Sequence, residues 1–188
     1  MAKFSPLMVA PPLIFAGLAA MFVLGMNREN PDVLPSQLID KQAPALTLTA
    51  FEGTPLLTDE VVRQPGLKLV NFWGTWCVAC RAEHPMLLRI EDLLPVTLHG
   101  VNFDETIEGA PEKYLAEEGN PFTTLGKDLS KATKIDWGVY GAPETFLIDK
   151  DGNVLLRIAG PLTQRVMEST LVPAVQKALA AETEQGGS

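Results

Sequence analysis

Two cysteines, the only ones in the chain, lie three residues apart at positions 77 and 80, within the run WGTWCVAC. This run directly follows an apolar stretch, residues 67–72. A strand that leads into Cys-x-x-Cys at the start of a helix is the arrangement used by dithiol oxidoreductases. Because positions i and i+3 share a helix face, the two sulfurs can form a disulfide without a backbone movement.

The start of the predicted helix also activates the first sulfur. Free backbone N–H groups and the positive end of the helix dipole point at Cys77, whereas Cys80 lies one turn inside. A thiol in such a position has a lowered pKa, so we predict that Cys77 is the nucleophile. Since the chain has no third cysteine, these two residues carry out any thiol chemistry together.

Two metal-binding alternatives compete with redox chemistry. Zinc needs four ligands, and only His84 and His99 remain as soft partners for the cysteines, so a fourth ligand is missing. A copper chaperone would hold Cu(I) with paired thiolates and is the non-enzymatic alternative. Copper carriers usually add a distant histidine, and no histidine follows His99. We therefore predict a dithiol enzyme with no metal and no other cofactor.

The composition limits the size and the partners of the protein. The 188 residues suffice for one domain and an attached segment. Lys3 and Arg28 are the only charged residues before Glu29, so the chain from there onward carries 13 basic and 23 acidic residues, a net charge of −10. No basic stripe is available to neutralise phosphates, which argues against a nucleic-acid partner.

The segment Leu7–Met26 contains no charged residue. Roughly 20 apolar residues can span a bilayer as a helix, and Lys3 before them predicts a cytoplasmic N-terminus. A cleaved signal peptide is the alternative, with Gly17-Leu18-Ala19 as a poor cleavage site. Because the apolar run is long for a signal peptide, we predict an uncleaved single-pass anchor and an exported domain.

The sequence divides into four predicted parts. These are an N-terminal anchor (residues 1–28), a juxtamembrane linker with Pro31 and Pro35 (29–42), a globular domain (43–181) and a polar tail (182–188). Within the domain, strands are predicted at 67–72, 96–102 and 122–125, helices at 77–94, 111–118, 129–137 and 162–181, and hairpins at 46–53 and 145–158. This order predicts a mixed α/β sheet flanked by helices.

Two segments of the domain resemble a known family. Residues 69–85 read LVNFWGTWCVACRAEHP, and residues 136–149 read DWGVYGAPETFLID. Together with the N-terminal anchor, they resemble the thioredoxin superfamily, and within it the membrane-anchored periplasmic thiol–disulfide interchange proteins of cytochrome c maturation (the CcmG/DsbE type). The resemblance extends from about residue 43 to about residue 161, and it implies a thioredoxin-like fold, here with an N-terminal hairpin.

The resemblance also implies roles for individual residues. Cys77 corresponds to the exposed nucleophile and Cys80 to the buried resolving thiol. The Ala142–Pro143 bond corresponds to the cis-proline beside the disulfide, where backbone groups can hold a substrate strand. With Trp76, these two residues form the expected substrate groove.

The chain departs from thioredoxins at two positions. Asn71 stands where they have a buried aspartate, and Ala79 where they have proline. Because an asparagine cannot accept the proton of Cys80, either another acid or water has to accept it. Glu83, on the cysteine face of the helix, and Glu144, directly after the expected cis-proline, are the predicted acids that tune the active site.

The predicted function is that of a reductant in the periplasm, tethered to the bacterial inner membrane. By resemblance, it keeps the cysteines of apocytochrome c, or of a thiol protein of the maturation system, reduced for haem attachment. Its electrons would come from a DsbD/CcdA-type membrane donor. A general membrane-tethered periplasmic disulfide reductase with another client is the alternative enzyme.

Overall fold

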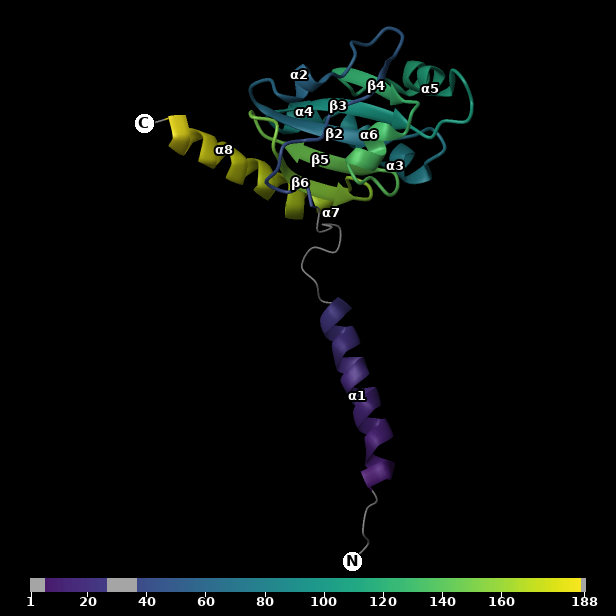
Figure 1. Cartoon of the computed structure of the whole chain (residues 1–188), viewed down its shortest axis with the longest axis vertical. Helices are drawn as coiled ribbons and strands as arrows, with labels where there is room; N and C mark the ends of the chain where they lie inside the picture. The colour runs from purple at the N-terminus through teal and green to yellow at the C-terminus, as the bar shows by residue number, and fades with distance from the viewer. Residues whose placement is uncertain (1–5, 27–36, 187–188) are drawn as a thin grey trace, which may run out of the picture. The chain divides into compact units, whose positions relative to one another are not determined.

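The computed structural model describes residues 6–26 and 37–186 (Figure 1). The chain forms two compact units, Met1–Pro31 and Asp32–Ser188. The first contains helix α1 (Pro6–Met26), at the position where the sequence predicts a membrane-spanning helix. Within the described residues, no helix combines the length and the apolar character required to cross a membrane. Most of the predicted linker falls on residues 27–36, which lie outside the described residues.

The second unit is built on a six-stranded mixed sheet with the order β1-β4-β3-β2-β5-β6 (Figure 1). Strands β2, β3 and β4 are parallel, whereas β1, β5 and β6 pair antiparallel with their neighbours. The strands are β1 (Thr49–Ala50), β2 (Leu67–Trp73), β3 (Val96–Phe103), β4 (Thr124–Asp128), β5 (Glu144–Ile148) and β6 (Val154–Ala159). The expected mixed α/β sheet is confirmed.

Helices and connecting segments cover both faces of this sheet. They are α2 (Asp59–Val62), α3 (Val78–Leu87), α4 (Ile90–Leu93), α5 (Ala110–Glu118), α6 (Ala132–Asp136), α7 (Gln164–Val166), the π-helix η1 (Met167–Leu171) and α8 (Val172–Gly186). Buried side chains of α3, α4, α5, η1 and α8 form one hydrophobic cluster, which includes both cysteines. A second cluster contains buried residues of α2 and of the segment after α6. We call these two sides the disulfide face and the opposite face.

Strand β2 lies at the centre of the sheet and is buried along its whole length. Successive side chains of a strand point to opposite faces. Leu69 and Trp73 therefore contribute to the cluster on the disulfide face, and Val70 and Phe72 to the cluster on the opposite face. The same alternation directs Asn71 toward the disulfide face.

The predicted N-terminal hairpin is wrong. Strand β1 pairs with the distant strand β4, with Thr49 opposite Lys127, and the predicted hairpin is reduced to a single antiparallel bridge between Phe51 and Thr54. Proline at position 55 has no N–H with which to continue a hairpin ladder. Its carbonyl oxygen instead accepts a hydrogen bond from the N–H of Leu125 in β4, at 2.9 Å. The segment therefore joins the edge of the main sheet.

Two predicted helices are also interrupted. The helix expected at residues 77–94 is divided into α3 and α4, which are separated by Leu88 and Arg89. Pro85 lies in the last turn of α3, where it removes a helical N–H donor. The helix expected at residues 162–181 contains the π-helix and continues to the end of α8 at residue 186. The hairpin of β5 and β6 is confirmed, with one register irregularity after Leu147.

Candidate active site

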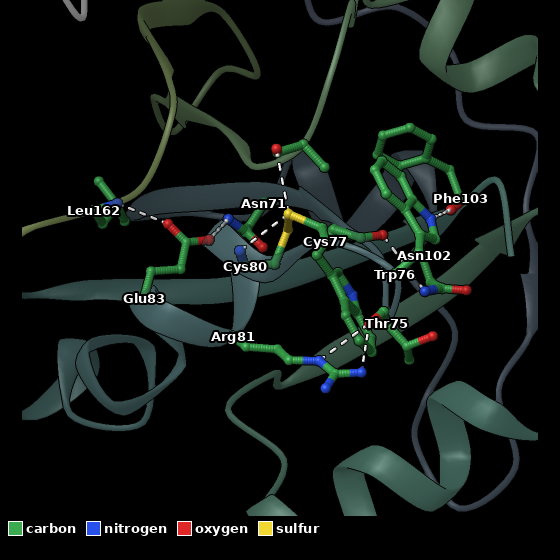
Figure 2. Close-up of a disulfide and its surroundings, with 12 residues drawn as sticks. Asn71, Thr75, Trp76, Cys77, Cys80, Arg81, Glu83, Asn102, Phe103 and Leu162 are labelled. Carbon is green, nitrogen blue, oxygen red and sulfur yellow. Dashed lines mark hydrogen bonds between the residues drawn. A yellow bond between two sulfur atoms is a disulfide. The ribbon is translucent and has the colours of Figure 1, made fainter.

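The two cysteines form a disulfide where α3 begins (Figure 2). Cys77 is the N-cap residue of α3, and its Sγ accepts a hydrogen bond from the backbone N–H of Cys80 at 3.0 Å. An N–H donor and the positive helix end stabilise a thiolate at this sulfur. The predicted redox pair at a helix start is therefore present in the structure.

Exposure does not separate the two cysteines in this oxidised state. Cys77 is 5% exposed and Cys80 is 6% exposed, so the predicted exposure of the first sulfur is wrong for the disulfide form. The side chains next to it are far more accessible, with Trp76 48% and Val78 82% exposed. What distinguishes Cys77 is its position at the helix start, between two exposed apolar side chains.

The peptide bond between Ala142 and Pro143 is cis, as predicted. The carbonyl oxygen of Ala142 lies 3.3 Å from the Sγ of Cys77, so a reduced thiol at this position can donate a hydrogen bond to it. Trp76 also lies beside the disulfide, where its indole N–H donates to the carbonyl oxygen of Phe103 at 3.2 Å. Ala142 and Trp76 therefore line the surroundings of Cys77, whereas Pro143 is buried.

Glu83 lies in α3 on the disulfide face and is 2% exposed. Its Oε1 accepts a hydrogen bond from the amide Nδ2 of Asn71 at 3.0 Å, and its Oε2 accepts one from the backbone N–H of Leu162 at 2.7 Å (Figure 2). Burial raises the pKa of Glu83 to about 7, although these two hydrogen bonds oppose the rise. A carboxyl group with this pKa can gain or lose a proton at neutral pH.

A small cavity of about 10 Å³ connects this acid with the resolving cysteine. Cys80 and Glu83 both line it, together with Trp73 and His84. A space of this size is close to the minimum that holds one water molecule. A water in this space could carry a proton between the carboxyl group and the Cys80 thiol. The structure therefore places Glu83 close to the resolving cysteine, and its tuning role stays a prediction.

The predicted position of Glu144 beside the sulfurs is wrong. In the sheet, Glu144 is paired with Phe72 and Thr145 with Asn71. Because side chains alternate along a strand, Glu144 points to the opposite face, away from Asn71 and the disulfide face. Its carboxylate is nevertheless as buried as that of Glu83, at 2% exposure.

The carboxylate of Glu144 is fully engaged by the loop before β5 and by Arg157 of β6. Oε1 accepts hydrogen bonds from the backbone N–H groups of Tyr140 and Gly141 at 2.8 and 3.2 Å. Oε2 accepts from the Nε of Arg157 at 2.7 Å, and Arg157 also donates to the carbonyl oxygen of Gly138 at 2.7 Å. Glu144 therefore holds the loop that leads into the cis-proline.

One acid that contacts the loop before Cys77 is not among the predicted site residues: Glu105, which follows β3. Its Oε1 accepts hydrogen bonds from the N–H of Thr75 at 2.6 Å and from the Nδ2 of Asn102 at 2.9 Å. Its Oε2 accepts from the hydroxyl group of Thr75 at 2.7 Å. The one available signal was topological, because the carboxyl ends of adjacent parallel strands meet at one edge of a sheet.

The histidines weighed as zinc ligands have other partners. Nε2 of His84 lies 3.1 Å from the carbonyl oxygen of Gly119, and Nδ1 of His99 lies 2.9 Å from the hydroxyl oxygen of Thr124. Burial lowers the pKa of His99 to about 4. Across the described part of the chain, no cluster of three or more His, Cys, Asp or Glu side chains could hold a metal ion.

The mixed sheet, the Cys-x-x-Cys disulfide at a helix start and the adjacent cis-proline define a thioredoxin-like dithiol oxidoreductase. The family model described as Redoxin matches residues 39–175. The DsbE homolog of Paracoccus denitrificans (strain Pd 1222), a thiol:disulfide interchange protein, is 47% identical over 182 residues, which cover 97% of this chain and 100% of that protein. The thiol:disulfide interchange protein HelX of Rhodobacter capsulatus is 41% identical, with 89% and 94% coverage.

A solved structure supports the same assignment. The crystal structure of a Chlorobium tepidum protein, provisionally assigned as the thiol:disulfide interchange protein DsbE, has a TM-score of 0.61 and 26% identity, and it covers 74% of this chain and 99% of that chain. The chain therefore belongs to the Redoxin family within the thioredoxin superfamily, in the group of DsbE-type thiol–disulfide oxidoreductases.

Proposed function

We propose that this oxidoreductase acts as a reductant in cytochrome c maturation. Its client is apocytochrome c or a thiol protein of the maturation system. The observation that carries the direction is Glu83, buried on the disulfide face and lining one cavity with Cys80. A carboxylate near the sulfurs disfavours a thiolate, which stabilises the disulfide and makes the dithiol a stronger reductant.

The reaction proceeds through one mixed disulfide. The Cys77 thiolate attacks one sulfur of the client disulfide, and the other client sulfur leaves as a thiolate. The Cys80 thiolate then attacks Cys77, which closes the internal disulfide and releases the second client thiolate. Glu83 accepts the proton of Cys80 in this step. In total, two electrons pass from the two cysteines to the client. The two client thiolates take up two protons from solvent, which balance the proton that Cys77 lost on ionisation and the one that Glu83 accepted.

The proposed location is the periplasm, with the N-terminal segment as an anchor in the inner membrane. This proposal is supported by the sequence, in which residues 7–26 carry no charge, and by the oxidising compartments in which disulfide chemistry operates. Electrons would then arrive from a DsbD/CcdA-type membrane donor. After an alkaline wash of membranes, the full chain should stay in the pellet with its original N-terminus. A soluble form that begins near Ala20 would show a cleaved signal instead.

The reduction potential of the full chain, equilibrated with glutathione, tests the direction. A potential near that of thioredoxin, about −270 mV, supports a reductant, whereas one near that of DsbA, about −120 mV, contradicts the proposal.

A Cys80→Ser variant tests the client, because it removes the resolving thiol and should accumulate mixed disulfides on Cys77. Adducts with apocytochrome c or a maturation protein support the proposed pathway. Adducts spread over unrelated periplasmic proteins would indicate a general reductase. Cys77→Ser is the matched control, in which no adducts should accumulate.

A further inference from the structure

The loop that carries Cys77 is hydrogen-bonded to the segment that follows the neighbouring strand β3. Thr75, two residues before the nucleophile, donates both its N–H and its hydroxyl group to the carboxylate of Glu105 at 2.6 and 2.7 Å. Its carbonyl oxygen accepts hydrogen bonds from Nε and Nη2 of Arg81 at 3.1 and 2.8 Å (Figure 2). Every polar group of Thr75 is therefore fixed.

The carboxylate of Glu105 is itself held by a rigid element. Asn102, which is 2% exposed, donates from Nδ2 to Glu105 Oε1 at 2.9 Å. Asn102 of β3 is paired with Trp73 of β2 in the parallel ladder at the centre of the sheet. The support of Glu105 and the start of the Cys77 loop are therefore both attached to central strands. The carbonyl oxygen of the next residue, Phe103, accepts a hydrogen bond from the indole N–H of Trp76 at 3.2 Å. Residues at and directly after the end of β3 thus hold two consecutive residues of the loop, Thr75 and Trp76.

We propose that Glu105 is a positioning residue for thiol–disulfide exchange. Its carboxylate fixes Thr75, and through Thr75 it fixes the backbone from which the N–H of Cys77 bonds to the carbonyl oxygen of Gly74 at 3.2 Å. Sulfur exchange requires the attacking, central and leaving sulfurs to lie in one line. A displacement of the nucleophile by about 1 Å can slow such a reaction roughly 100-fold.

Two variants at this position separate geometry from charge. Glu105→Gln keeps an oxygen that accepts from Thr75 and Asn102, and its new amide group can donate to the Thr75 hydroxyl oxygen, which also accepts. Glu105→Gln therefore removes the negative charge and preserves the hydrogen bonds that hold Thr75. Glu105→Ala removes both the charge and these hydrogen bonds. Glu108→Ala, which removes an exposed acid from the same loop, is the matched control.

The measurement is the rate of reaction of the reduced full-length protein with glutathione disulfide, followed over pH until the Cys77 thiolate is fully formed. At this plateau, a change in the pKa of Cys77 no longer affects the rate. We expect Glu105→Ala to lower the plateau by about tenfold or more. We expect Glu105→Gln to stay within about twofold of the original chain, and Glu108→Ala to have no effect.

Two results would overturn the proposal. An unchanged plateau rate in Glu105→Ala would show that the hydrogen bonds from Thr75 to Glu105 do not position the nucleophile. An equal loss in Glu105→Gln would show that the charge, and not the geometry, is what matters. If Glu105→Ala does not fold, Thr75→Val takes its place, because it removes only the hydroxyl hydrogen bond. A loss of about threefold in that variant supports the proposal, and an unchanged plateau contradicts it.

Discussion

Glu83 and Glu144 are equally buried, at 2% exposure, yet the sheet separates them into two different environments. Glu83 lies on the disulfide face and accepts hydrogen bonds from two neutral donors, the Asn71 amide and the Leu162 N–H. Glu144 lies on the opposite face and is ion-paired with the buried Arg157.

The comparison shows that burial alone does not make a carboxyl group an acid of the active site. Neutral donors only partly offset the cost of burying a charge, so the pKa of Glu83 rises to about 7. The buried cation Arg157 compensates the charge of Glu144 directly, so this carboxylate has a structural role and holds the loop before β5. The role of each glutamate therefore depends on the groups that contact its carboxylate, and these groups depend on which face of the sheet the side chain occupies.

The largest expected effect is on stability, from breaking the ion pair. Arg157→Met leaves the carboxylate of Glu144 buried without its cation, so we expect a loss of about 3–5 kcal/mol in the free energy of unfolding, measured by urea denaturation. Arg89→Met, at an exposed arginine, is the control and should change stability by less than about 0.5 kcal/mol. A loss below about 1 kcal/mol for Arg157→Met would remove the distinction between the two glutamates.

The second prediction concerns stability against pH. Since the folded-state pKa of Glu83 lies above its ordinary value of 4.5, the folded protein binds the extra proton between these pH values. The stabilisation of the folded state by this bound proton is therefore present below about pH 4.5, falls as the pH rises toward about 7, and is lost above that. Each pKa unit corresponds to about 1.4 kcal/mol, so the total loss approaches roughly 3 kcal/mol.

Urea denaturation of the oxidised protein between pH 5 and pH 8 measures this effect. The free energy of unfolding of the Glu83→Gln variant should change less with pH than that of the original protein, because the glutamine amide does not titrate. The Asn71 side chain can turn its oxygen, which has no hydrogen-bond partner in the structure, toward the new amide. Parallel curves for the two proteins would rule out Glu83 as the titrating group.

The third prediction compares the glutamates through the redox reaction. Glu83→Gln should shift the reduction potential toward oxidising by about 30 mV, equivalent to about 1.4 kcal/mol, because it removes the charge that disfavours a thiolate. It should also remove the titration near pH 7 from the rate of client reduction. Glu144→Gln should shift the potential much less, since its carboxylate lies on the opposite face. Equilibration with glutathione measures the potential, and the rate of client reduction is followed separately between pH 6 and pH 8.

The smallest expected effect comes from the support of Asn71. Its amide donates to the hydroxyl oxygen of Thr145 at 3.0 Å as well as to Glu83. Thr145→Val removes this acceptor and keeps the shape, so we expect a loss of about 1 kcal/mol in thermal unfolding experiments. Thr97→Val, at a half-buried strand position, is the matched control. Equal effects at both sites would mean that the hydrogen bond to Asn71 contributes nothing.

Local patterns were sufficient to predict much of this molecule. The apolar run before Cys77 specifies β2, the Cys-x-x-Cys spacing specifies the disulfide, and the turn at residues 149–153 specifies the hairpin of β5 and β6. Each of these features depends on residues that are close in sequence. The placement of Glu83 on the cysteine face followed from helical spacing alone.

The features that were missed depend on contacts between distant segments. The face of Glu144 could not be derived without the register between β2 and β5, because a shift by one residue reverses every side chain. Strand β1 pairs with residues more than 70 positions away, at Lys127, whereas its short alternating pattern by itself predicts a local hairpin. Glu105 lies in an irregular loop, whose conformation no periodic pattern encodes.

The hydrogen bond from Leu162 to Glu83 has a consequence for the boundaries of the functional fragment. It joins positions 79 residues apart, and Leu162, which is 1% exposed, lies in the same hydrophobic cluster as both cysteines. A shortened protein that ends with β6 at Ala159 would keep the whole sheet and both sulfurs. It would still lose a donor to the acid, so the smallest fragment with native redox behaviour has to extend beyond Leu162.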